Sequence, residues 1–144
     1  MSSVRGERGF SASVETAILV PALVLIIALV VGTGRLALAR LSVHQWADSA
    51  SRTATLARDA GSAQSRARAV VASDAAGSAT QCRGGWHLSV DTSAFALPVG
   101  QPGAVRVTVR CAVPLADLLL PGVPGSITVE GHASSTLDRY RGRS

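Results

Sequence analysis

The sequence predicts an α+β protein anchored in a membrane, with one long N-terminal helix followed by a small antiparallel β-sheet head that contains one disulfide. Three observations predict this fold. Residues 16–34 form an uncharged and mostly aliphatic run, three later segments alternate apolar with polar residues, and the only two cysteines both lie in the second half of the chain. The run is typical of a membrane span, the alternation of half-buried strands, and the cysteine pair of an exported domain.

Composition excludes several classes of protein. The chain has 144 residues, a formal net charge of +5 and only 3% aromatic residues, which leaves too little material for a large enzyme core. All 14 basic residues are arginines, and they are scattered along the chain instead of forming a basic patch. We therefore expect no nucleic-acid partner, and the sequence contains no motif for a cofactor.

The apolar run predicts a transmembrane helix at residues 10–35. Its nineteen uncharged residues between Glu15 and Arg35 would cover about 28 Å as a helix, close to the ~30 Å hydrocarbon thickness of a bilayer. Pro21 removes one backbone hydrogen bond, so we expect a kink there while the helix continues. A short cytoplasmic leader, residues 1–9, precedes the span and could be removed.

The same run has a second interpretation as a cleaved secretory signal. Arg5 and Arg8 supply a basic start, and Ala37-Leu38-Ala39 offers a cleavage site that would release a secreted protein beginning at residue 40. Glu15 directly before the run and Arg35 between the run and the site are unusual for a signal peptide. The sequence therefore favours a retained anchor.

The N-terminal motif is more particular. Arg8-Gly9, Val14-Glu15 and Pro21 stand at the spacing of a type IV pilin-like N-terminus, and this segment most closely resembles the TadE-like family, the minor pseudopilins of tight-adherence (Flp-type) pilus systems. The resemblance implies that a prepilin peptidase cuts between Gly9 and Phe10. It also implies that Glu15 pairs with the new amino group of a neighbouring subunit and sets the register of assembly. On physical grounds alone, Glu15 could instead mark the start of the helix at the lipid headgroups, where the helix dipole favours a negative charge.

Residues 36–76 predict a helical extension beyond the membrane, because they contain no proline and only one glycine. Apolar residues recur at helical spacing and form a narrow stripe that could pack on a partner helix or on the chain's own C-terminal part. The stripe consists of Leu36, Val43, Ala47, Ala50, Ala54 and Ala57.

Residues 77–135 predict the β-containing head, with strands near residues 86–90, 105–113 and 127–129. A hairpin in which opposed residue numbers sum to 193 would place Cys82 opposite Cys111 and Trp86 opposite Val107, with the apolar residues on one face. Two cysteines on the exported side of a membrane protein predict a disulfide between Cys82 and Cys111, and this places the head outside. Residues 136–144 are expected to form a basic tail.

Metal binding and catalysis have weak support. Cys82, Cys111, His87 and His132 could be considered as a metal site, but no metal-binding spacing is present and His87 would point away from the thiols. We expect His44, His87 and His132 to be solvated. The sequence contains no G-x-S-x-G or H-E-x-x-H string, so we expect no enzymatic activity, no catalytic residues and no cofactor.

These observations, together with the resemblance, predict a structural pseudopilin component in assembly of a tight-adherence pilus or a related secretion system. It would cross the cytoplasmic membrane once, with the N-terminus inside and the head outside, or be incorporated in the pilus. Its expected partners are the membrane, a prepilin peptidase and other pilin subunits that contact its N-terminal helix. A secreted small protein and an anchored envelope protein unrelated to pili remain the alternatives.

Overall fold

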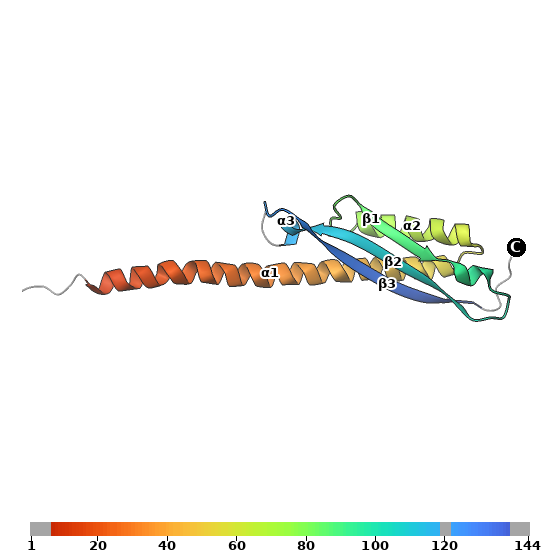
Figure 1. Cartoon of the computed structure of the whole chain (residues 1–144), viewed down its shortest axis with the longest axis horizontal. Coiled ribbons are helices and arrows are strands. Elements are labelled where there is room, and N and C mark those ends of the chain that lie inside the picture. Colours follow the sequence, from red (N-terminus) through yellow and green to blue (C-terminus); the bar gives the residue numbers. More distant parts are fainter. Residues whose placement is uncertain (1–6, 119–121, 139–144) are drawn as a thin grey trace, which may run out of the picture.

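The computed structural model describes residues 7–118 and 122–138, with side chains from residue 16 onward. In this part of the chain, a long helix α1 carries a head of two further helices and a three-stranded sheet at its C-terminal half (Figure 1). The elements are α1 (Glu7–Thr55), α2 (Ala60–Ala76), β1 (Trp86–Asp91), a 3₁₀ helix (Ser93–Ala96), β2 (Gly103–Pro114), α3 (Leu115–Leu118) and β3 (Ser126–Leu137). The predicted α+β class is confirmed. The expected leader is largely outside the described residues, as are residues 139–144 of the expected tail.

Helix α1 forms without interruption across the apolar run and the alanine-rich segment after it. Leucine and alanine are strong helix formers, and the fixed backbone angle of Pro21 is compatible with a helix that continues past it. The continuation predicted at Pro21 is thus observed, whereas the kink stays a prediction.

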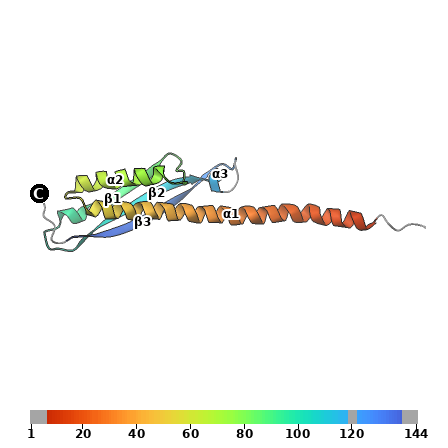
Figure 2. The ribbon, with the colours of Figure 1, turned by 180° about the vertical axis from the view of Figure 1, so that it is seen from behind.

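The helical extension differs from the expected single helix, which was to run to about residue 76. Helix α1 ends at Thr55, and α2 begins after Asp59, whose side chain accepts a hydrogen bond from the backbone N–H of Ser62 at 2.8 Å. This cap starts a new helix because it satisfies one of the free N–H groups at the helix N-terminus. The backbone N–H and the hydroxyl of Ser62 both donate to the Asp59 carboxylate, and these hydrogen bonds hold the pKa of that carboxyl below its usual range. Helix α2 then folds back along the end of α1 (Figure 2).

The sheet has the antiparallel order β1-β2-β3, and α1 packs against one of its faces. Figures 1 and 2 show this from opposite sides, with the strands in front of α1 in one view and behind it in the other. Alternation along β2 buries five side chains against the helices, while polar side chains occupy the outer face. The five buried side chains are Val105, Val107, Val109, Cys111 and Val113.

The apolar stripe of the extension packs within the chain. Val43 and the four alanines of the stripe are fully buried in the core formed with the sheet and α2, and Leu36 packs at its edge. Of the two interpretations that the sequence left open, intramolecular packing is the one observed. Small side chains allow this close approach of backbones.

The predicted hairpin register is wrong by four residues. Trp86 pairs with Cys111 and Leu88 with Val109, so opposed numbers in β1 and β2 sum to 197 instead of 193. Cys82 lies before β1 and approaches Cys111 through a turn, in which the N–H of Gly85 donates to the carbonyl of Cys82 at 3.1 Å. Gly84 and Gly85 have positive φ angles of 75° and 89°, which glycine adopts at little cost. The turn therefore brings the cysteine to its partner without placing it in the strand.

Candidate functional site

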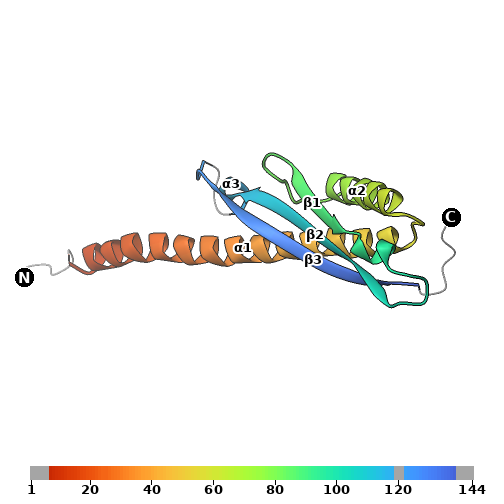
Figure 3. The same ribbon diagram turned by 45° about the vertical axis from the view of Figure 1, so that its right-hand side comes forward.

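The most conspicuous surface belongs to the N-terminal half of α1, which extends beyond the head (Figure 3). The apolar side chains described on this half are largely uncovered. The large aliphatic residues from Ile18 to Val31 that are exposed range from 45% to 70% exposed. Among the described residues, α1 is the one helix long and apolar enough to cross a membrane. A soluble monomer rarely shows such a continuous apolar surface, which is typical of a helix covered by lipid or by other apolar helices.

The sequence-predicted site residues lie along this half of α1. Gly9, Phe10, Glu15 and Pro21 are all within the helix, although the side chains of Phe10 and Glu15 fall outside the described part of the structure. Pro21 is followed by more than eight helical turns of α1. The roles predicted for Gly9, Phe10 and Glu15 need a partner chain and therefore stay predictions.

The other half of α1 is fixed rigidly to the head. Gly131 of β3 lies directly against the backbone of Val43 and His44. A Cβ atom added at Gly131 would lie 2.7 Å from the carbonyl carbon of Val43 and 2.8 Å from the N of His44, closer than such atoms pack. Only glycine allows β3 to approach α1 this closely. This contact makes the end of α1 and the sheet one packed body.

A second fixed point lies where α1 leaves the apolar run. The guanidinium of Arg35, through Nη1, donates a hydrogen bond to the carbonyl oxygen of Asp117 at 2.9 Å. Asp117 belongs to α3, so the first charged residue after the run contacts the end of the head nearest the free half of α1. This contact of Arg35 with the head was not predicted from the sequence.

The two cysteines form the predicted disulfide. Cys82 and Cys111 are bonded with their Cα atoms 5.2 Å apart, and Cys111 is buried in the core. The bond joins the turn after α2 to the central strand. The backbone N–H of Arg83 also donates to the carbonyl of Ala112 at 2.7 Å, so the same segment is held by a covalent and a polar link.

The outer face of the sheet is polar and carries a small charged cluster. Arg110 of β2 and Glu130 of β3 are opposed in register and form an ion pair with a distance of 2.9 Å between Nη2 and Oε1. The hydrogen bond from Arg110 holds the pKa of the Glu130 carboxyl below its usual range. His132 lies 3.6 Å from the same carboxylate, and its side chain is solvated, as expected. Cross-strand pairs of this kind contribute modestly to strand pairing and do not form a reaction centre.

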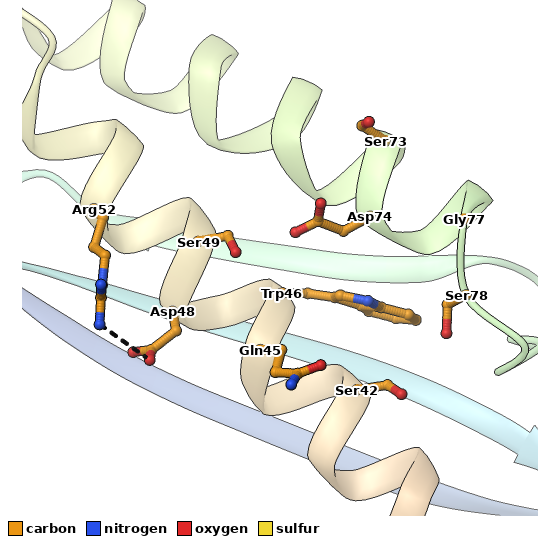
Figure 4. Close-up of a pocket in the computed structure, with 10 residues that line it drawn as sticks. All are labelled: Ser42, Gln45, Trp46, Asp48, Ser49, Arg52, Ser73, Asp74, Gly77 and Ser78. Atoms are coloured by element: carbon orange, nitrogen blue, oxygen red, sulfur yellow. Dashed lines mark ion pairs between the residues drawn. The ribbon is translucent and has the colours of Figure 1, made fainter.

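A polar groove runs between the end of α1 and α2 (Figure 4). The indole of Trp46 lies across it toward Gly77 and Ser78, while Asp48 and Arg52 form an exposed ion pair at 3.8 Å at one side. Trp46 is only 3% exposed and belongs to the core. The groove is open to solvent, and two of its three charged side chains, Asp48 and Arg52, pair with each other.

The described residues give no support to a metal centre. Cys82 and Cys111, two of the four considered ligands, are bonded to each other, and no group of three or more His, Cys, Asp or Glu side chains in residues 7–118 and 122–138 could hold a metal. His87 points to the outer face with the other polar residues of β1.

Three structural residues were missed by sequence reasoning. Gly131 had no local signal beyond being a glycine inside a strand pattern, which often marks a close backbone approach. Trp46 stands three residues after Val43, so the helical period could have placed it in the core stripe. Asp59 followed by Ser62 could have been recognised as a helix start.

Comparison with known proteins agrees with the geometry of α1. A family model described as TadE-like protein matches residues 11–54, which cover the exposed apolar half of α1 and the part that packs in the head. The chain has no significant match among curated proteins or solved structures. Over residues 11–54 the chain is similar to TadE-like proteins, the family that its N-terminal motif resembles.

Proposed function

We propose that this chain is a pseudopilin-like structural subunit that acts in assembly of a tight-adherence pilus or a related secretion system. The observation that carries the proposal is the exposed apolar half of α1 within a TadE-like segment, joined without a break to a folded head. The exposed apolar side chains along this half of α1 can contact lipid or neighbouring helices. Such a helix is suited to anchor the subunit in the cytoplasmic membrane and then to pack among other pilin helices.

The proposed orientation places the N-terminus in the cytoplasm and the head outside. The disulfide supports it, because disulfides persist in oxidising compartments and are rare in the cytoplasm. A prepilin peptidase would then meet the leader on the cytoplasmic side.

The position of Ala39 argues against release by signal peptidase. Ala39 is 4% exposed, lies well inside α1 and belongs to the core. Cleavage after this residue would cut the helix in the middle of its contact with the sheet and separate Leu36 from the core. The folded head is therefore better suited to a retained anchor than to secretion.

The first test is the N-terminus of the protein isolated from its native membrane. Prepilin-type processing predicts a new terminus at Phe10, measured by intact mass and N-terminal sequencing. A terminus at Arg40 would instead identify a secreted protein, and an uncut chain would leave an anchored envelope protein without prepilin-type processing.

The second test is the charge at Glu15. We expect Glu15→Gln to reduce incorporation into pili at least about tenfold, since the loss of about 1.4 kcal/mol in subunit affinity already gives that factor. The reason is that the amide cannot neutralise the amino group of a neighbouring Phe10 in a low-dielectric setting. Pilus yield is measured in sheared fractions, and membrane insertion by resistance to alkaline extraction.

The matched control is Glu130→Gln, which removes an acid from the outer face of the head and should leave pilus yield unchanged. Normal pilus yield with Glu15→Gln would contradict the proposed role of Glu15. Loss of the protein from the membrane would show that Glu15 acts in insertion instead of assembly.

A further inference from the structure

The boundary of the membrane can be placed on α1 from charge and helix geometry. The uncharged residues 16–34 rise about 28 Å, which nearly fills the ~30 Å hydrocarbon layer. Arg35 is the first charged side chain after them and belongs at the level of the lipid headgroups. The last uncharged turn, from Leu29 to Gly34, therefore lies just inside the outer edge of the hydrocarbon.

The head begins before this boundary, not after it. Gly32 is buried, and an apolar notch of about 100 Å³ is formed by α1 together with the end of the head that carries α3. The head thus overlaps with the last uncharged turn of α1 along the helix axis (Figure 3). The notch is lined by Leu29, Gly32, Thr33, Leu36, Leu115, Leu118 and Ile127.

The residues at the α3 end of the head are mostly apolar, which favours contact with lipid over contact with water. The hydroxyl of Thr33, the one polar side chain of the notch, donates to the carbonyl oxygens of Leu29 at 3.0 Å and Val30 at 2.9 Å. Ile127 is 36% exposed, and the sequence between Asp117 and Glu130 contains no charged residue. Arg35 donates through its guanidinium to the carbonyl oxygen of Asp117, so these two charged residues lie together and mark the outer limit of the apolar surface.

We propose that the α3 end of the head rests in the outer interface of the bilayer, where Leu115 and Ile127 contact acyl chains beside Leu29. Two contacts with the bilayer, the span and this apolar end, then fix the orientation of the head relative to the membrane. The span alone would leave that orientation free. Burial of apolar surface favours this contact. The inference rests on anchoring by α1 and does not depend on the proposed pilus role.

The test measures which positions meet lipid in the full chain. Single cysteines are introduced at Ile127, Leu25 and Val99, with the native disulfide left oxidised, and each is labelled with a thiol-reactive nitrobenzoxadiazole dye. The proteins are reconstituted in phosphatidylcholine–phosphatidylglycerol vesicles. Fluorescence is then quenched either by phosphatidylcholine with a spin label on its acyl chain or by aqueous iodide. The spin label is near the top of the chain for Ile127 and Val99, and near the end of the chain for Leu25, which lies at the centre of the uncharged run. Val99 is the matched control, because it is also apolar and 64% exposed but lies in the loop before β2, at the opposite end of the sheet from Ile127.

The expected result is a loss of fluorescence with the lipid quencher at Ile127 and Leu25, together with iodide quenching only at Val99. Iodide quenching at Ile127 equal to that at Val99 would overturn the inference, because the head would stand clear of the bilayer. Shielding of Ile127 from both quenchers would also overturn it and indicate cover by protein. A lack of lipid quenching at Leu25 would show that anchoring by α1 itself is wrong. A Leu115→Cys variant repeats the measurement if Ile127→Cys fails to fold, which the fluorescence of Trp46 and Trp86 reports.

Discussion

Replacing Gly131 by alanine is expected to lower the free energy of unfolding of the head by about 3 kcal/mol or more, at the upper end of the usual cost of overpacking. The added Cβ would meet the backbone of Val43 and His44 in the fully packed part of α1. A flexible side chain could move aside, but a helix backbone that is buried against a sheet cannot. The change is measured by urea unfolding of the full chain in detergent micelles, followed through the fluorescence of Trp46, which α1 contributes to the core, and of Trp86 in β1, which packs against that core.

The matched control is the same substitution at Gly34, where a Cβ atom would meet nothing within 4 Å. Gly34 lies in α1, so Gly34→Ala should leave the head intact or stabilise the helix by up to about 1 kcal/mol through helix propensity. Equal and small effects of the two substitutions would mean that β3 can move away from α1. The rigid joint between the helix and the sheet would then be wrong.

The features that depend on local sequence patterns or on residue counts were predictable from the sequence. The uncharged run identified the apolar helix because its length alone matches the bilayer, and the alternation of Val105, Val107 and Val109 identified the buried face of the central strand. The pairing of Cys82 with Cys111 followed from there being only two cysteines. Each of these three predictions depends on local composition or on counting, and none requires the geometry of the loops.

The hairpin register was not predictable in the same way. A shift of four residues leaves every side chain of β1 on the same face of the sheet, so the apolar pattern is equally satisfied by the expected register and by the observed one. The turns on either side of β1 determine which register forms. They are the bend at Gly84 and Gly85 and the short 3₁₀ helix before β2. The disulfide, which was predicted from the cysteine pair, forms in spite of the different register because the turn carries Cys82 to its partner.

The break between α1 and α2 has a similar explanation. Residues 56–59 contain no proline, and helix propensity alone does not end a helix there. The helix ends because α2 gains more by folding back, where Ala63, Ala67 and Val71 are buried, than by extending into solvent. Such tertiary gains are not visible in a local pattern.

The apolar surface of α1 was predictable from the sequence, but the position of the head along α1 was not. The sequence located the exposed apolar helix and the residues of the N-terminal motif. It did not indicate that the head reaches down to Leu29 and Gly32, because that contact joins residues about 90 positions apart in the chain. Depth in the membrane is a property of the folded head and of α1 together.

The disulfide should matter because of where it lies in the head. Strand β1 is at the edge of the sheet and is paired only with β2, and the disulfide fastens the chain just before β1 to the buried centre of β2. Without it, the link between α2 and the sheet would depend on β1 pairing and on the hydrogen bond from Arg83 to Ala112. The covalent bond closes a loop whose ends are separated by 29 positions in the sequence.

Removing this bond is expected to lower the free energy of unfolding by about 3–4 kcal/mol, because closing a loop of this length restricts the unfolded chain by that amount. The double variant Cys82→Ala with Cys111→Ala is preferred to serine, since a hydroxyl at the buried position 111 would add a separate cost. The measurement is urea unfolding in micelles with and without reductant. The native chain should lose stability when reduced, whereas the double variant should be insensitive to reductant and lie near the reduced native protein. If reduction leaves the native midpoint unchanged, pairing of β1 and the core hold the head together on their own, and the disulfide then contributes nothing to its stability.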